Sequence, residues 1–546
     1  MGRADHLLWY GRVLWSMGRL VNRTVSLRVT QATVRRRLET RDERFLSLAR
    51  RYIFDSPPCP YNQLLRHAGC EYGDLVGMVR QRGLDVTLED LRDEGVYLTF
   101  EEFKGRTDVV RGGRSWRFSE HDFDNPFLRV AVETRTGGSR SRGSPVSVGL
   151  RFLEENVTPG IHGTLLAMDA LRLPVVLWSP GASAVSAFLA LVHVGSPPVR
   201  WFTMHDLDEP FVSPRTRLMP RVARTLARWR GVRLPLPEFN PVTQVEPVLA
   251  TLRGLRARRG GCVLFTSPST AVRLAVLARD RGEGLSGVRF ITTMEPLTPG
   301  KLGEIETSGA RAGSLYGFTE GGMAGIPCGD PQGPDDMHLL FYDLATISHR
   351  RTIPEVGELN AYMFTSLSTL PPKIMLNVES DDFGELTTRH CRCPLDGWGL
   401  YQHLASVRSF TKLTGEGSTI LGTDCVHILE EILPREFGGR SIDYQLLEVE
   451  DEDHLTRLYL LVSPDLGALD EARLLQRFIE EIRARTSQGV RMWRQAETIR
   501  VTRRHPVATP RGKILPFHTQ GLAAFMAVGS ADLAALATPH PAGRPT

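Results

Sequence analysis

The middle of this chain is constrained most strongly by short apolar runs that alternate with helix-like stretches. Pro174–Trp178, Cys262–Thr266 and Val288–Thr293 each have the length and composition of one buried strand. Helix-like stretches follow the first two runs, over Ala182–Val192 and Thr270–Ala278. Alternation of this kind predicts α/β layers with an at least partly parallel sheet.

The sequence changes character from about Ser409. Two alternating runs, Ile442–Glu450 and Thr456–Val462, are joined by an acidic, turn-like segment and predict a hairpin. The pattern over Leu474–Arg485 predicts a helix. In the N-terminal third, Gly95–Phe100 alternates between apolar and polar residues and predicts a strand.

A chain of 546 residues is too long for one compact core. We therefore predict an α/β protein whose large, multi-layer domain of mixed sheets and helices covers residues 1–408. A small, mobile α+β lid is predicted over residues 409–527, within the usual size range of a domain. Residues 528–546 are rich in Ala, Gly, Pro and Thr and are predicted to be a disordered tail.

The charge balance is mild, with 67 basic and 62 acidic side chains and a net charge of +5. These charges are interleaved, which is typical of a solvated surface and not of a nucleic-acid-binding face. No apolar run reaches the ~18 residues that a transmembrane helix needs. The seven scattered cysteines favour a reducing, cytoplasmic location. Apolar residues between Leu7 and Val21 recur at helical spacing and predict a helix that packs on the main domain or lies on a membrane surface.

Two motifs far apart in the sequence carry the strongest functional signal. Ser314–Gly322 (SLYGFTEGG) places hydroxyls, aromatic rings and one acid among glycines, a composition suited to nucleotide and metal. Thr509–Lys513 (TPRGK) presents one lysine beside a glycine. In this order the motifs resemble the adenylate-forming superfamily of acyl-CoA synthetases, peptide-synthetase adenylation domains and luciferases. Within it the chain is most similar to the phenylacetate-CoA ligase-like branch, in keeping with Glu101–Arg106.

A loop over residues 134–145 combines glycines, hydroxyl groups and arginines. Glycines let the backbone approach an anion, and consecutive amides can form a cradle for phosphate. The loop has no Gly-Lys-Ser/Thr end and is therefore not a Walker loop. It resembles the Ser/Thr/Gly-rich loop of adenylate-forming enzymes, and Gly138, Ser139 and Ser141 are its predicted phosphate-binding residues. An ordinary surface turn is the alternative interpretation.

The resemblance implies roles for both motifs. Glu320 would coordinate Mg²⁺, which prefers oxygen ligands and bridges substrate phosphates. The Thr319 hydroxyl would contact a phosphate, and Tyr316 would stack near adenine. Lys513 would be the catalytic lysine, brought to the α-phosphate only when the lid closes. Taken alone, Glu320 would be an exposed loop acid and Lys513 a surface lysine.

Further nucleotide contacts are implied in the region before the predicted lid. Glu295 lies in a segment that resembles the Gly-Gly-Glu-Pro-Leu adenine-binding turn, with Thr293 and Met294 in place of the glycines. Glu295 could equally be structural.

The family places an aspartate where Asp381 and Asp382 stand, to accept both ribose hydroxyls, because a carboxylate has two acceptor oxygens. We slightly prefer Asp382. Arg408 resembles the arginine that precedes the interdomain hinge and contacts ribose, although the acidic pair that usually follows is missing and Lys412 could be the hinge residue.

Four metal-binding side chains follow the first motif. Cys328, His338, Cys391 and Cys393 could form a closed tetrahedral zinc site, as in some phenylacetate-CoA ligase-like proteins. The Cys-x-Cys spacing is tighter than the common spacer, and buried free cysteines are the alternative. Zinc would pin the loop behind the nucleotide and would not catalyse.

The leading functional hypothesis is ATP-dependent activation of an acyl or aryl carboxylic acid to an acyl-adenylate, with release of pyrophosphate. A thiol, first of all CoA, would then capture the acyl group. The acceptor could instead be an amine, a carrier-protein thiol or another nitrogen nucleophile. A non-catalytic, nucleotide-binding relative is the alternative of a different class.

Overall fold

The computed structural model describes residues 24–128, 131–135, 145–179, 181–204, 206, 220–222, 224–225, 227–229, 231, 233–353, 357–410, 412–415, 418–485, 493, 496–507 and 514–519. The helix predicted between Leu7 and Val21 and the tail predicted over 528–546 lie outside these residues. Among the described helices, none combines the length and the apolar composition that crossing a membrane requires.

A six-stranded parallel sheet occupies the middle of the chain, with strand order β10-β9-β8-β5-β6-β7. Its strands are β5 (Val175–Ser179), β6 (Arg200–Thr203), β7 (Pro237–Phe239), β8 (Cys262–Thr266), β9 (Val288–Thr292) and β10 (Arg311–Ser314). The helices between and before these strands are α9 (Thr158–Ala167), α10 (Gly181–His193), α12 (Glu246–Arg259), α13 (Pro268–Asp280) and α14 (Pro299–Thr307). The alternating apolar runs therefore correctly predicted a parallel α/β layer.

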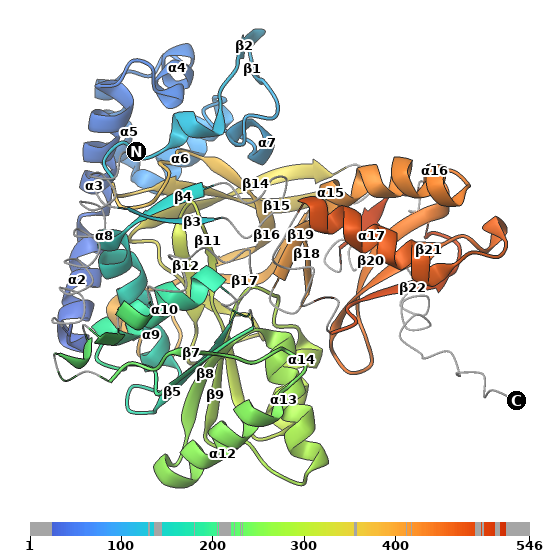
Figure 1. Ribbon diagram of the computed structural model, residues 1–546. Helices are drawn as coiled ribbons and strands as arrows, with labels where there is room; N and C mark the ends of the chain where they lie inside the picture. Colours follow the sequence, from blue (N-terminus) through green and yellow to red (C-terminus); the bar gives the residue numbers. More distant parts are fainter. Residues whose placement is uncertain are drawn as a thin grey trace, which may run out of the picture.

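Both faces of this sheet are covered at its centre, where every residue of β5 and β8 is buried. Val175 and Leu177 of β5 share one core with residues of α9 and α10, whereas Val176 and Trp178 share the opposite core with residues of α12 and α13. This division follows from the two-residue period of a strand. Figure 1 shows the resulting three-layer arrangement below the centre of the molecule.

A seven-stranded antiparallel sheet follows, with strand order β11-β12-β13-β17-β16-β15-β14. Its strands are β11 (Tyr316–Phe318), β12 (Gly322–Pro327), β13 (Met337–Leu339), β14 (Leu344–Ile353), β15 (Gly357–Ser366), β16 (Val378–Thr388) and β17 (Gln402–Ser409). The ring of Phe318 on β11 lies 4.7 Å, centroid to centroid, from that of Phe364 on β15. Side chains of the first strand thus reach those near the far edge, which requires a strongly curved sheet.

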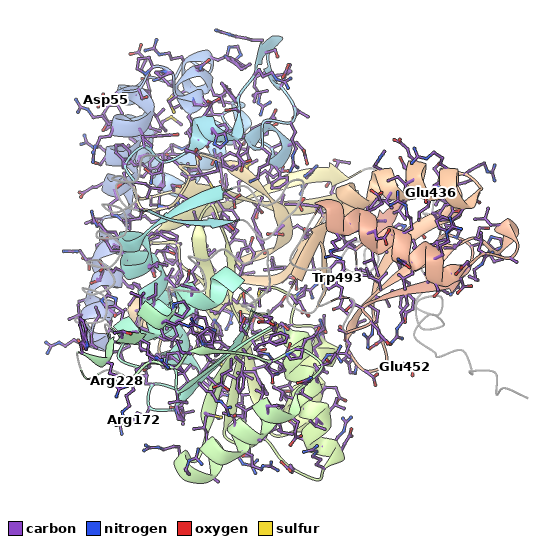
Figure 2. The ribbon with its side chains drawn as sticks, in the orientation of Figure 1. Asp55, Arg172, Arg228, Glu436, Glu452 and Trp493 are labelled. Carbon is purple, nitrogen blue, oxygen red and sulfur yellow. The ribbon has the colours of Figure 1, made fainter. Side chains whose placement is uncertain are left out.

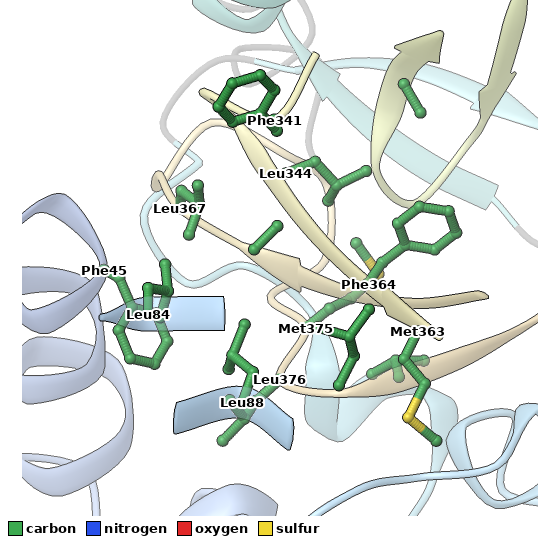
Figure 3. Close-up of a cluster of buried hydrophobic side chains, with 14 of the residues drawn as sticks. Phe45, Leu84, Leu88, Phe341, Leu344, Met363, Phe364, Leu367, Met375 and Leu376 are labelled. Atoms are coloured by element: carbon green, nitrogen blue, oxygen red, sulfur yellow. The ribbon is translucent and has the colours of Figure 1, made fainter. Parts of the chain in front are cut away.

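The N-terminal helices pack on the antiparallel sheet. They are α2 (Leu27–Glu39), α3 (Arg41–Leu48), α4 (Pro60–His67), α5 (Tyr72–Arg82), α6 (Leu84–Asp93) and the short α7 (Phe100–Phe103). Phe45, Leu84 and Leu88 from these helices share one buried core with Phe364 and Leu376 of the sheet region (Figure 3). The strand predicted over Gly95–Phe100 is wrong. Only Leu98 forms a bridge, to Val378, because the Thr99–Glu102 capping box starts α7 directly afterwards.

The C-terminal lobe, residues 412–519, contains a four-stranded mixed sheet with strand order β22-β21-β20-β23. Its strands are β20 (Tyr444–Glu450), β21 (Thr456–Val462), β22 (Ile499–Arg503) and β23 (Phe517–His518), and a two-stranded ribbon of β18 (Lys412–Gly415) and β19 (Ser418–Leu421) precedes them. The helices are α15 (Gly422–His427), α16 (Leu433–Phe437) and α17 (Glu471–Arg485). The predicted hairpin and the predicted helix are confirmed.

This lobe has a hydrophobic core of its own, which includes Leu446, Phe478 and Trp493. Trp493 is 1% exposed and lies inside the lobe, whereas Glu436 and Glu452 lie on its surface (Figure 2). In Figure 1 the lobe, in orange and red, stands beside the two larger sheets. An independent movement of this lobe remains a prediction.

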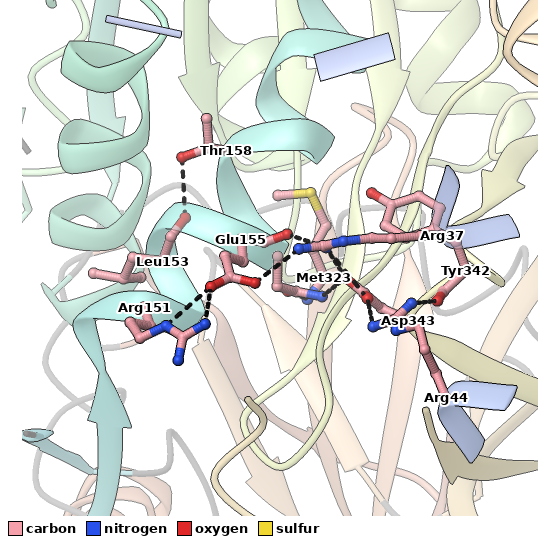
Figure 4. A network of polar contacts seen from close by, with 10 residues as sticks. Arg37, Arg44, Arg151, Leu153, Glu155, Thr158, Met323, Tyr342 and Asp343 are labelled. Carbon is pink, nitrogen blue, oxygen red and sulfur yellow. Dashed lines mark hydrogen bonds and ion pairs between the residues drawn. The ribbon is translucent and has the colours of Figure 1, made fainter. Parts of the chain in front are cut away.

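An ion-pair network around the buried Asp343 fastens α2 to the rest of the molecule (Figure 4). Arg37 pairs with Asp343 and with Glu155, each at 3.0 Å, and Arg44 also pairs with Asp343, at 2.9 Å. The Asp343 side chain is 2% exposed, so these partners replace the water that the carboxylate loses on burial. The neighbouring Asn156 accepts a hydrogen bond from the Met323 amide, 3.2 Å away, just after the glycine-rich motif.

Replacement of Arg37 by Met is expected to lower the free energy of unfolding by about 3 kcal/mol, because it leaves Asp343 buried with only Arg44 as an ionic partner. Urea denaturation followed by tryptophan fluorescence measures this change. Arg350→Met is the matched control, because Arg350 is 74% exposed and its pair with Glu358 contributes less than about 1 kcal/mol. Equal stability of the Arg37 variant and the parent would contradict the structural role of the network.

Candidate active site

The glycine-rich motif lies where the two large sheets meet. Strand β10 of the parallel sheet ends at Ser314, and the edge strand β11 of the antiparallel sheet begins at Tyr316. The Tyr316 hydroxyl donates a hydrogen bond to Asp382 Oδ2 on β16, at 2.8 Å. Burial and the nearby Asp382 carboxylate raise the pKa of Tyr316 well above its usual range, so the phenol remains a neutral donor. The structure thus brings together two predicted site residues that are far apart in the sequence.

Asp381 and Asp382 point to different partners because successive strand residues face opposite sides. The backbone carbonyl and the carboxylate of Asp381 both accept the Ser409 hydroxyl, at 3.0 Å, and Asp381 is 2% exposed. Asp382 faces Tyr316. Of the two acids, the geometry therefore places Asp382 beside the motif and Asp381 against the end of β17.

Glu320 pairs with Lys104, a residue that the sequence motifs did not indicate as part of the site. Lys104, at the end of α7, donates to Glu320 Oε1 at 2.6 Å and to Glu120 Oε1 at 2.9 Å. Burial acts to lower the pKa of Lys104, but the charges of Glu320 and Glu120 outweigh it, so the pKa is raised and the ammonium stays charged. A cation that binds Glu320 must share the carboxylate with Lys104 or displace it. Thr319 lies half-buried in the same turn.

Glu295 follows β9 in a buried polar cluster. Glu295 Oε2 accepts the Ser269 hydroxyl at 2.5 Å and pairs with Lys301 Nζ at 3.2 Å, and both the Glu295 and Lys301 side chains are fully buried. Lys301 also donates to the Thr456 hydroxyl of the C-terminal lobe, at 2.8 Å. This cluster therefore joins the predicted adenine-binding turn to the β20–β21 hairpin.

Met294 adopts the backbone conformation that favours glycine. Its φ of 75° is in the left-handed region, which costs a residue with a Cβ atom roughly 1–2 kcal/mol. Met294 stands where the Gly-Gly-Glu-Pro-Leu turn has its second glycine. The left-handed backbone conformation is thus present although the glycine is not. The sequence alone, with Met294 in place of a glycine, does not indicate this conformation.

Arg408 lies on β17, directly opposite Phe383 of β16 and one residue before Ser409, which is opposite Asp382. Its guanidinium donates to Asp335 Oδ2 at 2.8 Å. Asp335 was not among the predicted site residues. Pairs of consecutive aspartates in loops are usually exposed to solvent. The sequence therefore does not indicate that Asp335 is buried against Arg408.

The four predicted metal ligands converge. The ligand atoms of Cys328, His338, Cys391 and Cys393 all lie within 4.8 Å of one another, and the four residues are buried. His338 Nε2 lies 3.0 Å from Cys393 Sγ and 3.5 Å from Cys391 Sγ.

The surroundings orient this cluster and favour the thiolate form at Cys393. His338 Nδ1 lies 2.7 Å from the Leu400 carbonyl, which keeps Nε2 free to face the sulfurs. The amides of Asp330 and Leu395 donate to Cys328 Sγ and Cys393 Sγ, at 3.3 and 3.4 Å. Hydrogen bonds from Cys328 and His338 hold the pKa of Cys393 well below its ordinary value.

Four predicted residues lie outside the described part of the chain. These are Gly138, Ser139 and Ser141 of the phosphate loop and the catalytic candidate Lys513.

The residues on either side of the segment with Lys513 are bound by one side chain, that of Gln445. The fully buried side-chain amide of Gln445 donates to the Val507 carbonyl at 3.0 Å and to the Leu515 carbonyl at 2.8 Å, and its Oε1 accepts the Val507 amide at 2.7 Å. One side chain of β20 thus binds both flanks of the TPRGK segment.

Comparison with known proteins gives a fold and no closer relationship. No protein-family model matches the chain, and no curated protein sequence matches it. Among solved structures, the fold is that of the adenylate-forming enzymes.

One solved structure with this fold is that of 2-hydroxyisobutyryl-CoA ligase in complex with 2-HIB-AMP and CoA, in the thioesterification state. Its TM-score is 0.52 at 12% sequence identity, over 89% of this chain and 90% of that one. Amide bond synthetase McbA from Marinactinospora thermotolerans also matches, with a TM-score of 0.38 at 12% identity, over 91% of this chain and 97% of that one. A TM-score of 0.38 does not establish a shared fold. At 12% identity, the first shows the fold and not the activity.

Proposed function

We propose that this protein is an ATP-dependent ligase that activates a carboxylic acid as an acyl-adenylate. The observation that carries the proposal is the contact between Tyr316 and Asp382, at 2.8 Å, next to the turn with Glu320, in a chain with the adenylate-forming fold. In the proposed reaction, a carboxylate oxygen of the acid attacks the α-phosphorus of ATP. Pyrophosphate leaves, and an acyl-AMP remains.

The residues of the site suit the parts of ATP. The two oxygens of Asp382 can accept both ribose hydroxyls, with Tyr316 beside them. Glu320 offers the hard oxygen ligand that Mg²⁺ prefers, and the metal would neutralise charge on the phosphates. Glu295 lies on the turn that we assign to adenine, Arg408 would approach the ribose, and Lys513 would act at the α-phosphate.

The acceptor is proposed to be the thiol of CoA. The solved 2-hydroxyisobutyryl-CoA ligase is in complex with an acyl-AMP and with CoA, and we infer the same two kinds of ligand for this chain. The C-terminal lobe is proposed to be the mobile lid that brings Lys513 to the nucleotide for adenylation. An amine, or a thiol on a carrier protein, would require the same adenylate.

A panel of carboxylic acids, assayed for release of pyrophosphate with ATP and Mg²⁺, tests the proposal. At least one acid is expected to give pyrophosphate and AMP in equal amounts when CoA is present. Formation of ADP would indicate a kinase. Saturable ATP binding without pyrophosphate from any acid would support the non-catalytic alternative and contradict the ligase.

We further propose that Cys328, His338, Cys391 and Cys393 bind one structural Zn²⁺. Three sulfurs and one imidazole nitrogen form a closed tetrahedral set of the kind that structural zinc sites use. Zn–S distances of about 2.3 Å place tetrahedral sulfurs about 3.8 Å apart, which is compatible with ligand atoms within 4.8 Å of one another. Arg389 Nη2, 3.8 Å from Cys328 Sγ, would balance part of the negative charge of three thiolates.

Elemental analysis of protein purified without chelator is expected to give about one zinc per chain. Replacing both Cys391 and Cys393 with Ser should remove the metal, because two ligands are lost. Cys70→Ser, which changes a buried cysteine outside the cluster, should retain it. A folded, active protein that contains no zinc would overturn the zinc assignment and leave the adenylation proposal intact.

A further inference from the structure

Two consecutive acids, Asp335 and Asp336, connect the cysteine–histidine cluster to the nucleotide side of the molecule. They end the loop that leaves β12 after Pro327 and enters β13 at Met337. The Cys328 amide donates to the Asp336 carbonyl at 3.1 Å, which closes this loop at its base. The first proposed zinc ligand and the acidic pair are therefore direct neighbours across the loop.

Asp336 faces the cluster. Its Oδ1 lies 2.8 Å from His403 Nδ1, its Oδ2 accepts the Gln332 amide at 2.8 Å, and the carboxylate also pairs with Arg389. Oxygen, nitrogen and sulfur ligand atoms of Asp336, His403 and Cys328 lie within 4.8 Å of one another. A displacement of Cys328 would therefore also displace Asp336.

Asp335 faces the opposite way. Its Oδ2 accepts from Arg408 Nη1 at 2.8 Å, and its Oδ1 accepts the Ser406 amide at 3.1 Å. Ser406 has a φ of 54°, at the irregularity of β17 that separates His403 from Arg408. Asp335 is 5% exposed, so this charged contact is shielded from water. One carboxylate therefore sets both the course of β17 and the direction of Arg408.

We propose that Asp335 is a positioning residue for Arg408, and that Asp335 and Asp336 couple Zn²⁺ binding to nucleotide binding. Zinc holds Cys328 and the base of the loop, the loop presents Asp335, and Asp335 aims Arg408 toward the nucleotide. The inference rests on the proposed function for the assignment of Arg408 to the nucleotide. Because coupling between two ligands is reciprocal, zinc must tighten ATP binding by the same factor as ATP tightens zinc binding.

The test measures two affinities of the full chain. Calorimetry gives the Kd of Mg·ATP for zinc-loaded and zinc-depleted protein, and competition with a chromophoric chelator gives the Kd of Zn²⁺ with and without saturating ATP. Both ligands are expected to tighten each other about tenfold in the parent protein. Asp335→Asn should keep zinc bound, weaken ATP and abolish the mutual effect. Asp335→Glu should restore part of that effect, because the longer side chain can still reach the guanidinium.

Asp396→Asn is the matched control, because Asp396 also lies close in sequence to a proposed zinc ligand, Cys393, but pairs with the exposed His390. It should leave both affinities and their coupling unchanged. If the zinc-depleted protein unfolds, the Kd of Zn²⁺ with and without saturating ATP still tests the coupling. Equal zinc affinity with and without ATP, in a protein that binds ATP, would overturn the coupling alone. Absence of saturable ATP binding in the parent would overturn the proposed function together with it.

Discussion

Glu320→Gln is expected to lower the rate of acid-dependent ATP–pyrophosphate exchange by about 10²–10³-fold, the range found when one electrostatic contact to a transition state is removed. The substitution keeps the size of the side chain and removes the charge that Mg²⁺ requires. It also leaves Lys104 paired with Glu120 only. Exchange of radiolabelled pyrophosphate into ATP, with an acid that the panel identifies, measures the rate.

Glu304→Gln is the control for removal of one negative charge. Glu304 lies on α14 and pairs with Arg279 at the surface, so exchange should remain close to that of the parent. Titration with Mg²⁺ adds a second measurement. The Glu320 variant should require a higher metal concentration for half-maximal rate. Unchanged exchange in that variant would remove Glu320 from the reaction.

Lys513→Ala is expected to reduce adenylate formation to a similar extent, by about 10²–10³-fold, while ATP binds almost as before. A positive charge that reaches the α-phosphate only in the closed state stabilises the transition state more than bound ATP, so the rate falls and the affinity does not. Single-turnover formation of acyl-AMP and calorimetric binding of ATP separate the two effects.

Arg511→Ala removes a charge two residues before Lys513 and is the matched control. It should have a much smaller effect on single-turnover formation of acyl-AMP. Adenylate formation at the parental rate in the Lys513 variant would contradict the assignment of this lysine. A parallel loss of ATP affinity would assign Lys513 to binding instead of catalysis.

Short sequence patterns correctly predicted those strands and helices whose formation depends mainly on neighbouring residues. The run Cys262–Thr266 is mostly apolar and forms a central strand that is buried throughout, with helices on both faces. The failure at Gly95–Phe100 has a local cause as well, because alternation is shared by strands and by extended segments that lead into a capped helix.

Long-range partners could not be predicted in this way. Nothing in the sequence around Lys104 indicates that it reaches Glu320, 216 residues away. Lys301 is completely buried, although an isolated lysine normally predicts a surface position. Cys328, His338, Cys391 and Cys393 were found because ligand type restricts the choice, whereas Asp335 belongs to a common class of acidic pair. The sequence therefore does not indicate the role of residues whose partners lie far away along the chain.

The contact of Lys301 with Thr456 has a consequence for the energetics of domain rotation. Glu450 likewise accepts the Thr298 hydroxyl, at 2.5 Å, so two polar bonds tie the β20–β21 hairpin to the start of α14. Movement of the hairpin away from α14 would expose the buried side-chain amine of Lys301 to solvent and weaken its contact with Glu295. Under the proposed function, opening of the lid and loosening of the proposed adenine-binding turn would then be a single event, and product could leave through the same movement.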